Sequence, residues 1–300
     1  MSSDHLDILL GFTIPGHHAR GRLVRLGPVL DDILSAHAYP PSIEKVLAEA
    51  LALAALLGST LKDDAGQMTL QAQTEAGVID LLVCDYRAGE LRGYVKFDAE
   101  RLAEVPADPS LFALFGKGYL AITFDQSVSG ERYQGIVPLE GASLADAAQS
   151  YFYQSEQIPT LVKLAVSQGG TDGCRVGGML LQHLPEGEEG RERLHTRLDT
   201  PEWDHVRMLG ETTGADELVD PTLPLQTLVW RLFNEENEVR LLDQAPLAKG
   251  CRCDPDHIAR VIARFPEAER QDMAGQDGVI RVDCEFCARS FPIDLEAVAQ

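Results

Sequence analysis

Four of the six cysteines lie in the last fifty residues of this 300-residue chain, where they form two close pairs. One residue separates Cys251 from Cys253, and two residues separate Cys284 from Cys287. Two thiolate pairs can supply the four corners of a tetrahedral zinc site. Each pair can also close on itself as a disulfide when no metal holds it. The C-terminal part of the chain is therefore expected to fold around its cysteines.

We predict that Cys251, Cys253, Cys284 and Cys287 bind one Zn²⁺ together, because four thiolates make the closed site typical of structural zinc. The two-residue gap of the second pair is common in zinc knuckles, whereas the one-residue gap of the first is unusual. His257 could replace one ligand, but we interpret it as an exposed residue of a helix.

The C-terminal unit has little apolar sequence from which to build a core. Asp254 and Pro255 are typical of a helix start, and the apolar face expected after them comprises Ile258, Val261, Ile262 and Phe265. A hairpin that the second cysteine pair caps should follow. Such a unit of about 60 residues has a marginal core, whereas structural zinc contributes about 10–16 kcal/mol of apparent binding free energy. Loss of the metal is therefore predicted to unfold it.

Residues 1–180 are predicted to form an α+β core domain with an antiparallel sheet and a buried helix. Apolar residues recur with helical spacing from 43 to 57, and alanines fill much of the other face, so we expect this helix to be buried on most sides. Ser42 is its expected N-cap and Gly58 its C-cap.

Short segments rich in β-branched and aromatic residues follow this helix, and turn signals separate them. We expect strands at 69–74, 78–86, 91–98, 119–125, 132–139 and 160–166. Short connections favour antiparallel pairing. Ser143 and Asp146 predict the start of a second helix that ends before Pro159. Glycines are expected to loosen the chain at about 170–178. Cys84 lies within a strand pattern and is interpreted as a small buried hydrophobe, and Cys174 is isolated.

Residues 181–225 are predicted to form an acidic, partly helical linker, and residues 226–300 the zinc-binding domain. Between 186 and 220 the chain has eleven acidic and four basic residues. Trp203, Val206 and Leu209 have helical spacing, but so thin an apolar stripe needs a neighbour for stability. Two interpretations stay open: a solvated linker, or a metastable segment that folds only when docked.

The formal charge of −21 argues against a nucleic-acid partner, because such a surface repels phosphate backbones. No apolar run reaches the roughly 20 residues of a membrane helix. The acidic N-terminus does not have the pattern of a signal peptide. We therefore expect a cytoplasmic protein, and in that reducing compartment cysteine pairs are metal ligands or redox sensors more often than structural disulfides.

Three features together resemble the 33-kDa heat-shock protein family of redox-regulated holdase chaperones: the cysteine spacing, the segment YFYQSEQIPT at 151–160, and RLFNEE at 231–236. The resemblance covers essentially the whole chain. It implies a reduced, zinc-loaded, inactive monomer and no enzymatic activity. Oxidant and unfolding stress would pair Cys251 with Cys253 and Cys284 with Cys287. The zinc domain and linker would then unfold, bind unfolded client proteins and favour a homodimer. ATP should not be needed, and the sequence has no phosphate-binding loop.

Other functions remain open at this stage. A zinc-ribbon-like binding protein with constitutive zinc would use the same four cysteines. A thiol-disulfide oxidoreductase would use Cys284 and Cys287 as a catalytic dithiol, but that motif normally opens a helix and here is expected to cap a hairpin. A zinc hydrolase needs an open coordination position, which four thiolates close.

Overall fold

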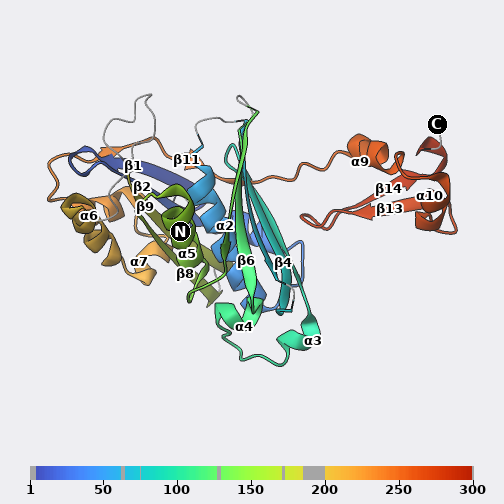
Figure 1. Cartoon of the computed structure of the whole chain (residues 1–300), viewed down its shortest axis with the longest axis horizontal. Coiled ribbons are helices and arrows are strands. Elements are labelled where there is room, and N and C mark those ends of the chain that lie inside the picture. The colour runs from blue at the N-terminus through green and yellow to red at the C-terminus, as the bar shows by residue number, and fades with distance from the viewer. Residues whose placement is uncertain are drawn as a thin grey trace.

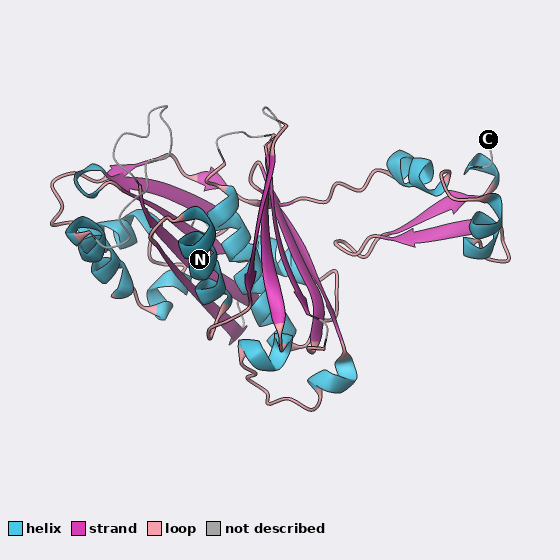
Figure 2. Cartoon of the chain, in the orientation of Figure 1, coloured by secondary structure: helices cyan, strands magenta, loops and turns pink. Residues whose placement is uncertain are grey.

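The computed structural model describes residues 5–61, 65–74, 76–126, 130–170, 173–184 and 200–298 (Figure 1). Two large, mainly antiparallel sheets and a set of helices make up most of it, and a small helix-and-hairpin unit follows at the C-terminus (Figure 2). The predicted α+β class is confirmed.

The first sheet has the strand order β10-β1-β2-β9-β8, with β11 also paired to β1, and all its pairs are antiparallel. Its strands are β1 (Ile8–Ile14), β2 (Ala19–Leu26), β8 (Thr160–Gly170), β9 (Gly173–His183), β10 (Arg240–Leu241) and β11 (Ala245–Pro246). Alternate side chains of β1 point to opposite faces, since Leu9 joins one buried cluster and Leu10 and Phe12 join another. Both faces of this sheet are therefore buried.

The second sheet has the order β12-β5-β4-β3-β6-β7, and only its short edge strand β12 pairs in parallel. Its strands are β3 (Gln67–Thr74), β4 (Ile79–Arg87), β5 (Glu90–Phe97), β6 (Gly118–Asp125), β7 (Arg132–Pro138) and β12 (Ala248–Lys249). β3 alternates buried and half-buried residues, with Gln67, Thr69, Gln71 and Gln73 on the face away from the core. The strands expected at 69–74, 78–86, 91–98, 119–125 and 132–139 and their antiparallel pairing are confirmed, with ends shifted by one or two residues. The strand expected at 160–166 is β8 of the first sheet, which continues to Gly170.

Helix α2 (Pro41–Gly58) lies between the two sheets (Figure 1). Most of its residues are buried, so the prediction of burial on most sides is confirmed. Both predicted caps are wrong. Pro41 is already helical, which places Ser42 inside the first turn, and Gly58 is the last helical residue before Ser59. A Cβ at Gly58 would lie 2.2 Å from the Tyr86 ring, so close packing explains this glycine better than a cap does.

The predicted loosening of the chain at about 170–178 is wrong for residues 173–178, which belong to β9. Gly177 and Gly178 pair with Arg25 and Val24 of β2. At Gly177 a Cβ would lie 2.1 Å from the carbonyl oxygen of Leu218, so this glycine permits a close approach of another backbone.

The predicted second helix is confirmed as α5 (Leu144–Tyr151), with a capping box between Ser143 and Asp146. It continues as a π-helix, η2 (Phe152–Glu156), that ends at Gln157 in the left-handed conformation. The Tyr151 ring is fully buried, and its hydroxyl bonds to the Glu156 carboxylate (Oη–Oε1 2.8 Å). Tyr151 and Phe152 thus anchor the start of the 151–160 segment in the core, whereas Tyr153 is exposed. The remaining short helices of this part are η1 (Pro15–His17), α1 (Pro28–Leu34), α3 (Ala99–Leu102) and α4 (Leu111–Phe115).

Three helices cover the outer face of the first sheet: α6 (Pro201–Glu211), α7 (Ala215–Val219) and α8 (Leu225–Phe233). The predicted helix around Trp203 and Val206 is confirmed, and both side chains are buried against the sheet. The prediction for residues 185–199 lies outside the described residues. The boundaries at 180/181 and 225/226 stay predictions, although β9 continues to His183 and the segment 225–249 packs with the two sheets.

The C-terminal unit contains α9 (Pro255–Ile262), α10 (Glu267–Met273), the hairpin β13 (Val279–Asp283) and β14 (Ser290–Asp294), and η3 (Glu296–Val298). Asp254 caps α9, and the second cysteine pair lies in the hairpin turn, as predicted. The predicted apolar face is only partly correct. Of its four residues only Ile262 is buried, and Val261 and Phe265 are each 38% exposed. Three buried residues, Ile262, Ile280 and Ile293, form the core of this unit.

Candidate metal centre and docked linker

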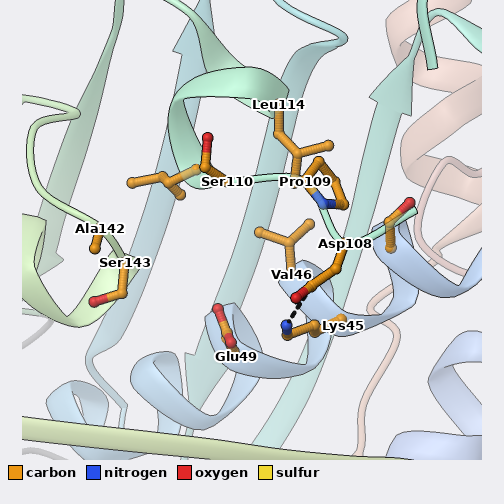
Figure 3. Close-up of a pocket in the computed structure, with 11 residues that line it drawn as sticks. Lys45, Val46, Glu49, Asp108, Pro109, Ser110, Leu114, Ala142 and Ser143 are labelled. Carbon is orange, nitrogen blue, oxygen red and sulfur yellow. Dashed lines mark hydrogen bonds and ion pairs between the residues drawn. The ribbon is translucent and has the colours of Figure 1, made fainter. Parts of the chain in front are cut away.

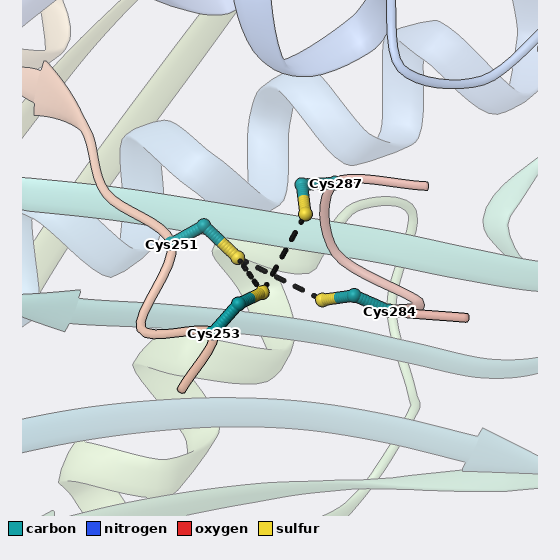
Figure 4. A group of neighbouring side chains, drawn as sticks. All are labelled: Cys251, Cys253, Cys284 and Cys287. Atoms are coloured by element: carbon teal, nitrogen blue, oxygen red, sulfur yellow. Dashed lines mark hydrogen bonds between the residues drawn. The ribbon is translucent and has the colours of Figure 1, made fainter. Parts of the chain in front are cut away.

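The four C-terminal cysteines converge from two loops (Figure 4). Cys251 and Cys253 come from the segment before α9, and Cys284 and Cys287 from the turn between β13 and β14. All four Sγ atoms lie within 4.8 Å of one another. Folding thus brings together two cysteine pairs that are more than thirty residues apart in the chain.

The sulfur geometry fits a tetrahedral ion. The Sγ atoms of Cys251 and Cys284 are 3.7 Å apart, and those of Cys253 and Cys287 are 3.6 Å apart. A Zn–S bond of about 2.3 Å places sulfurs about 3.8 Å apart in a tetrahedron. The Sγ atoms of Cys251 and Cys253 are closer, at 3.0 Å, and all four cysteines are free thiols. The cluster can hold a metal ion, and four sulfur ligands favour zinc in a closed site.

The thiols differ in acidity. Burial opposes ionisation of Cys287, but hydrogen bonds from Arg289 and from neighbouring thiols outweigh it and lower its pKa to about 6. The Arg289 Nε donor lies 3.5 Å from the Cys287 sulfur. Burial raises the pKa of both Cys251 and Cys253. The Cys287 thiol thus ionises more readily than those of Cys251 and Cys253, and thiolates are the form that binds metals and reacts with oxidants.

The cysteine loops contact the polar face of the second sheet. Arg252 donates from Nη1 to Gln67 Oε1 at 2.6 Å and lies 3.5 Å from the buried carboxylate of Asp85. Phe286, between the second pair, lies under the Arg92 guanidinium at 4.0 Å and edge-on to Tyr94 at 4.9 Å. Cation–π and aromatic contacts of this kind contribute roughly 0.5–2 kcal/mol each. The folded cysteine site is thereby joined to the sheet domain.

A single buried arginine fastens the linker to the first sheet. Arg25 of β2 is fully buried. It donates from Nε to the carbonyl of Leu218 (2.8 Å), from Nη1 to that of Leu223 (2.7 Å) and from Nη2 to that of Glu217 (3.0 Å). Burial lowers its pKa to about 10, so it remains charged at neutral pH. Two of these bonds satisfy carbonyls in the last turn of α7, which a helix leaves without internal partners, and the third holds the turn between α7 and α8.

Apolar side chains of the sheet lie beneath the docked helices. The sheet contributes Leu10, Phe12, Ile14, Leu23, Leu161, Ala165, Met179 and Leu181, and the residues above them include Trp203, Val206, Leu218, Leu228 and Phe233. Undocking the helices would expose this face to water at about 25 cal/mol per Å². A contiguous exposed apolar face is typical of a binding site for other proteins.

The two other cysteines, Cys84 and Cys174, are not members of the four-cysteine cluster. Cys84 is fully buried on β4, and burial raises the pKa of its thiol well above the usual value. Cys174 is nearly buried on β9, where burial raises its pKa to about 11. Both are poor nucleophiles at neutral pH. The interpretation of Cys84 as a buried hydrophobe is confirmed, and the structure shows His257 to be exposed.

A pocket of about 360 Å³ lies between α2 and the loop before α4 (Figure 3). Lys45 and Asp108 form an ion pair across it at 2.9 Å. Glu49 also lines it, and burial raises the pKa of this carboxyl to about 7. The described lining residues include no nucleophile paired with a base, so the pocket offers no catalytic constellation.

Sequence reasoning missed Arg25, Arg252 and Phe286. Arg25 has no local signal, because its partners are almost two hundred residues away. Arg252 lies between Cys251 and Cys253, and Phe286 lies between Cys284 and Cys287. These positions indicate that both residues belong to the site, but they do not predict which residues of the second sheet they contact.

Comparisons with known proteins agree with these features. The family model described as "Hsp33 protein" matches residues 7–294. The "33 kDa chaperonin" of Caulobacter vibrioides is 44% identical over 295 residues, which cover 96% of this chain and 95% of the relative. That of Ectopseudomonas mendocina is 40% identical over 284 residues, covering 94% and 90%. The crystal structure of the 33 kDa chaperonin from Thermotoga maritima shares the fold with a TM-score of 0.77 at 22% identity, covering 98% of this chain and 97% of that one.

In the part of the chain that the structure describes, no helix is both long and apolar enough to cross a bilayer.

Proposed function

The chain belongs to the Hsp33 family, and we propose that it is an ATP-independent holdase chaperone activated by oxidation of its zinc centre. One observation carries the proposal. Four clustered cysteines hold together a unit whose own core has three buried residues, and this unit follows a linker docked over an apolar sheet face. Such a unit depends on its cysteines for stability. Redox chemistry at the cysteines is therefore able to change the fold.

In the reduced state, Cys251, Cys253, Cys284 and Cys287 hold one Zn²⁺. When bound, zinc keeps the sulfurs as thiolates and adds binding free energy to the stability of the unit. Arg289 favours the ionised form of Cys287, and the contacts of Arg252 and Phe286 keep the loaded unit against the second sheet.

In the oxidised state, Cys251 pairs with Cys253 and Cys284 with Cys287. With a peroxide as oxidant, one thiolate of each pair attacks an O–O bond and becomes a sulfenic acid, and the hydroxide that leaves is protonated to water. The second thiol then attacks this sulfur, forms the S–S bond and releases a second water. Each pair loses two electrons. The sulfurs of Cys251 and Cys253 are 3.0 Å apart, closer than those of Cys251 and Cys284 or of Cys253 and Cys287, which supports the first of these two pairs.

Two disulfides leave no thiolates for the metal, so the C-terminal unit loses the ligation on which it depends and unfolds. The helices α6 to α8 then leave the first sheet, and the apolar face beneath them binds unfolded client proteins. The reduced protein is a cytoplasmic monomer, and the oxidised protein forms a homodimer. The net charge of −21 supports protein clients and not nucleic acid.

The deciding experiment follows zinc release, disulfide formation and suppression of client aggregation together, during peroxide treatment at elevated temperature. We expect one equivalent of zinc to leave, two disulfides to appear, and aggregation to be suppressed without ATP. Mass spectrometry should find the pairs 251–253 and 284–287, and cross-pairs 251–284 and 253–287 would contradict the proposed pairing. Retention of zinc with no gain of activity would indicate a zinc-ribbon-like protein with constitutive metal. Turnover of a disulfide substrate would indicate an oxidoreductase.

A further inference from the structure

Two histidines and a glutamate meet at the junction between the linker and the first sheet. His17 ends η1, His205 lies on α6, and Glu236 follows α8. The Nε2 atom of His17 is 2.6 Å from Oε2 of Glu236, and the Nε2 atom of His205 is 2.7 Å from Oε1. The two imidazole rings are stacked, with centroids 5.0 Å apart. Both rings thus present the same nitrogen to one carboxylate.

The donor set is one that transition metals favour. The three ligand atoms lie within 4.8 Å of one another. Zn–N and Zn–O bonds of about 2.0–2.2 Å place ligand atoms roughly 3.3 Å apart in a tetrahedron. A small outward movement of the rings would therefore admit an ion between nitrogen and oxygen. Three protein ligands leave a fourth position for water.

The burial of the three side chains suits a site that is held by the protein and reached from solvent. The Glu236 side chain is 10% exposed and that of His17 is 22% exposed, while that of His205 is 47% exposed. The Glu236 carboxylate is thus the most buried of the three groups, and His205 on α6 lies on the solvent side of the cluster. The strongly negative protein also raises the local concentration of divalent cations.

We propose that His17, His205 and Glu236 form a second metal site, for a divalent transition-metal ion such as Zn²⁺, which clamps α6 to the first sheet. The ligands come from the β1–β2 connection, from α6 and from the turn after α8, so they converge only when α6 is docked. An ion that binds only this state stabilises it by mass action. On the proposed chaperone function, the clamp raises the stress needed for activation. Binding and docking themselves do not depend on that function.

Metal binding is tested on the full-length reduced protein with zinc on its cysteines, titrated with Co²⁺ at neutral pH. We expect a second, weaker equivalent with d–d absorption and no sulfur-to-cobalt charge-transfer band. His205→Ala and Glu236→Gln should lose this equivalent and keep the first. His257→Ala, which removes an exposed histidine outside the cluster, is the matched control, and this variant should keep both equivalents of metal. Absence of a second equivalent, or its survival in both cluster variants, would overturn the site.

The clamp is tested by hydrogen exchange of the amides of α6 with and without the second equivalent of Zn²⁺. We expect exchange to slow at least several-fold in the parent protein and to stay unchanged in His205→Ala. Equal exchange with and without the ion in the parent protein would overturn the clamp. This readout involves neither oxidant nor client, so its failure is distinct from a failure of the cysteine switch.

Discussion

Replacing Arg25 with methionine should release the linker from the first sheet while zinc stays on the cysteines. The guanidinium is fully buried and donates to the carbonyls of Glu217, Leu218 and Leu223. Methionine keeps apolar bulk on β2 and removes every one of these donors. The carbonyls can recover partners only from water, which requires the end of α7 to leave the sheet.

The size of the effect follows from the three bonds. A hydrogen bond from a charged donor contributes about 1.5–3 kcal/mol. Burial of the guanidinium offsets part of this, as its pKa of about 10 indicates. We expect a net loss of about 2–5 kcal/mol in docking free energy, which shifts the docking equilibrium by roughly 30-fold to several-thousand-fold.

Hydrogen exchange and an aggregation assay measure this shift. In Arg25→Met, amides of α6, α7 and α8 should exchange faster while those of α2 stay protected. The reduced variant should suppress client aggregation without oxidant and still contain one equivalent of zinc. Arg22→Met is the control, because Arg22 lies on the same strand and, among the described residues, its guanidinium donates to the adjacent Gly21 carbonyl and not to the linker. Linker protection equal to that of the parent protein would refute the assignment of Arg25 as the linker anchor.

Four further substitutions test other parts of the structure. Cys84→Ser and Cys174→Ser should leave peroxide activation intact, because both thiols are buried and poorly acidic; loss of activation in either would show that a redox sensor lies outside the C-terminal cluster. Phe286→Ala removes the contacts with β5 and should speed peroxide-driven zinc release several-fold, whereas an unchanged rate would mean that docking does not protect the site. Burial raises the pKa of Glu49 from 4.5 to about 7, so the folded state holds a proton there and the resulting stability is lost as pH rises between these values. Glu49→Gln should therefore raise the free energy of unfolding by about 1–3 kcal/mol near pH 8 and leave it unchanged near pH 4, as urea melts would measure; equal effects at both pH values would contradict the shift.

Local signals explain which parts of the fold were predictable. The capping box of Ser143 and Asp146 spans three residues, and the alternation of β3 follows the pleat of a strand. The N-cap expected at Ser42 failed because Pro40 and Pro41 start the helix earlier. The glycines of β9 suggested a loose segment, but they serve close packing, which depends on the neighbours that the strand meets.

Two features were evident from the amino-acid sequence alone: four thiols at a spacing that can bind a metal, and the family to which the chain belongs. The tertiary structure decided what surrounds that chemistry: the contact of Phe286 with the second sheet, the anchoring of the linker by Arg25, and the meeting of His17 with His205 and Glu236. Spacing along the chain specifies ligands that lie close together, because a short segment has few conformations. Contacts between residues two hundred positions apart depend on how sheets and helices pack, and no local pattern records that packing.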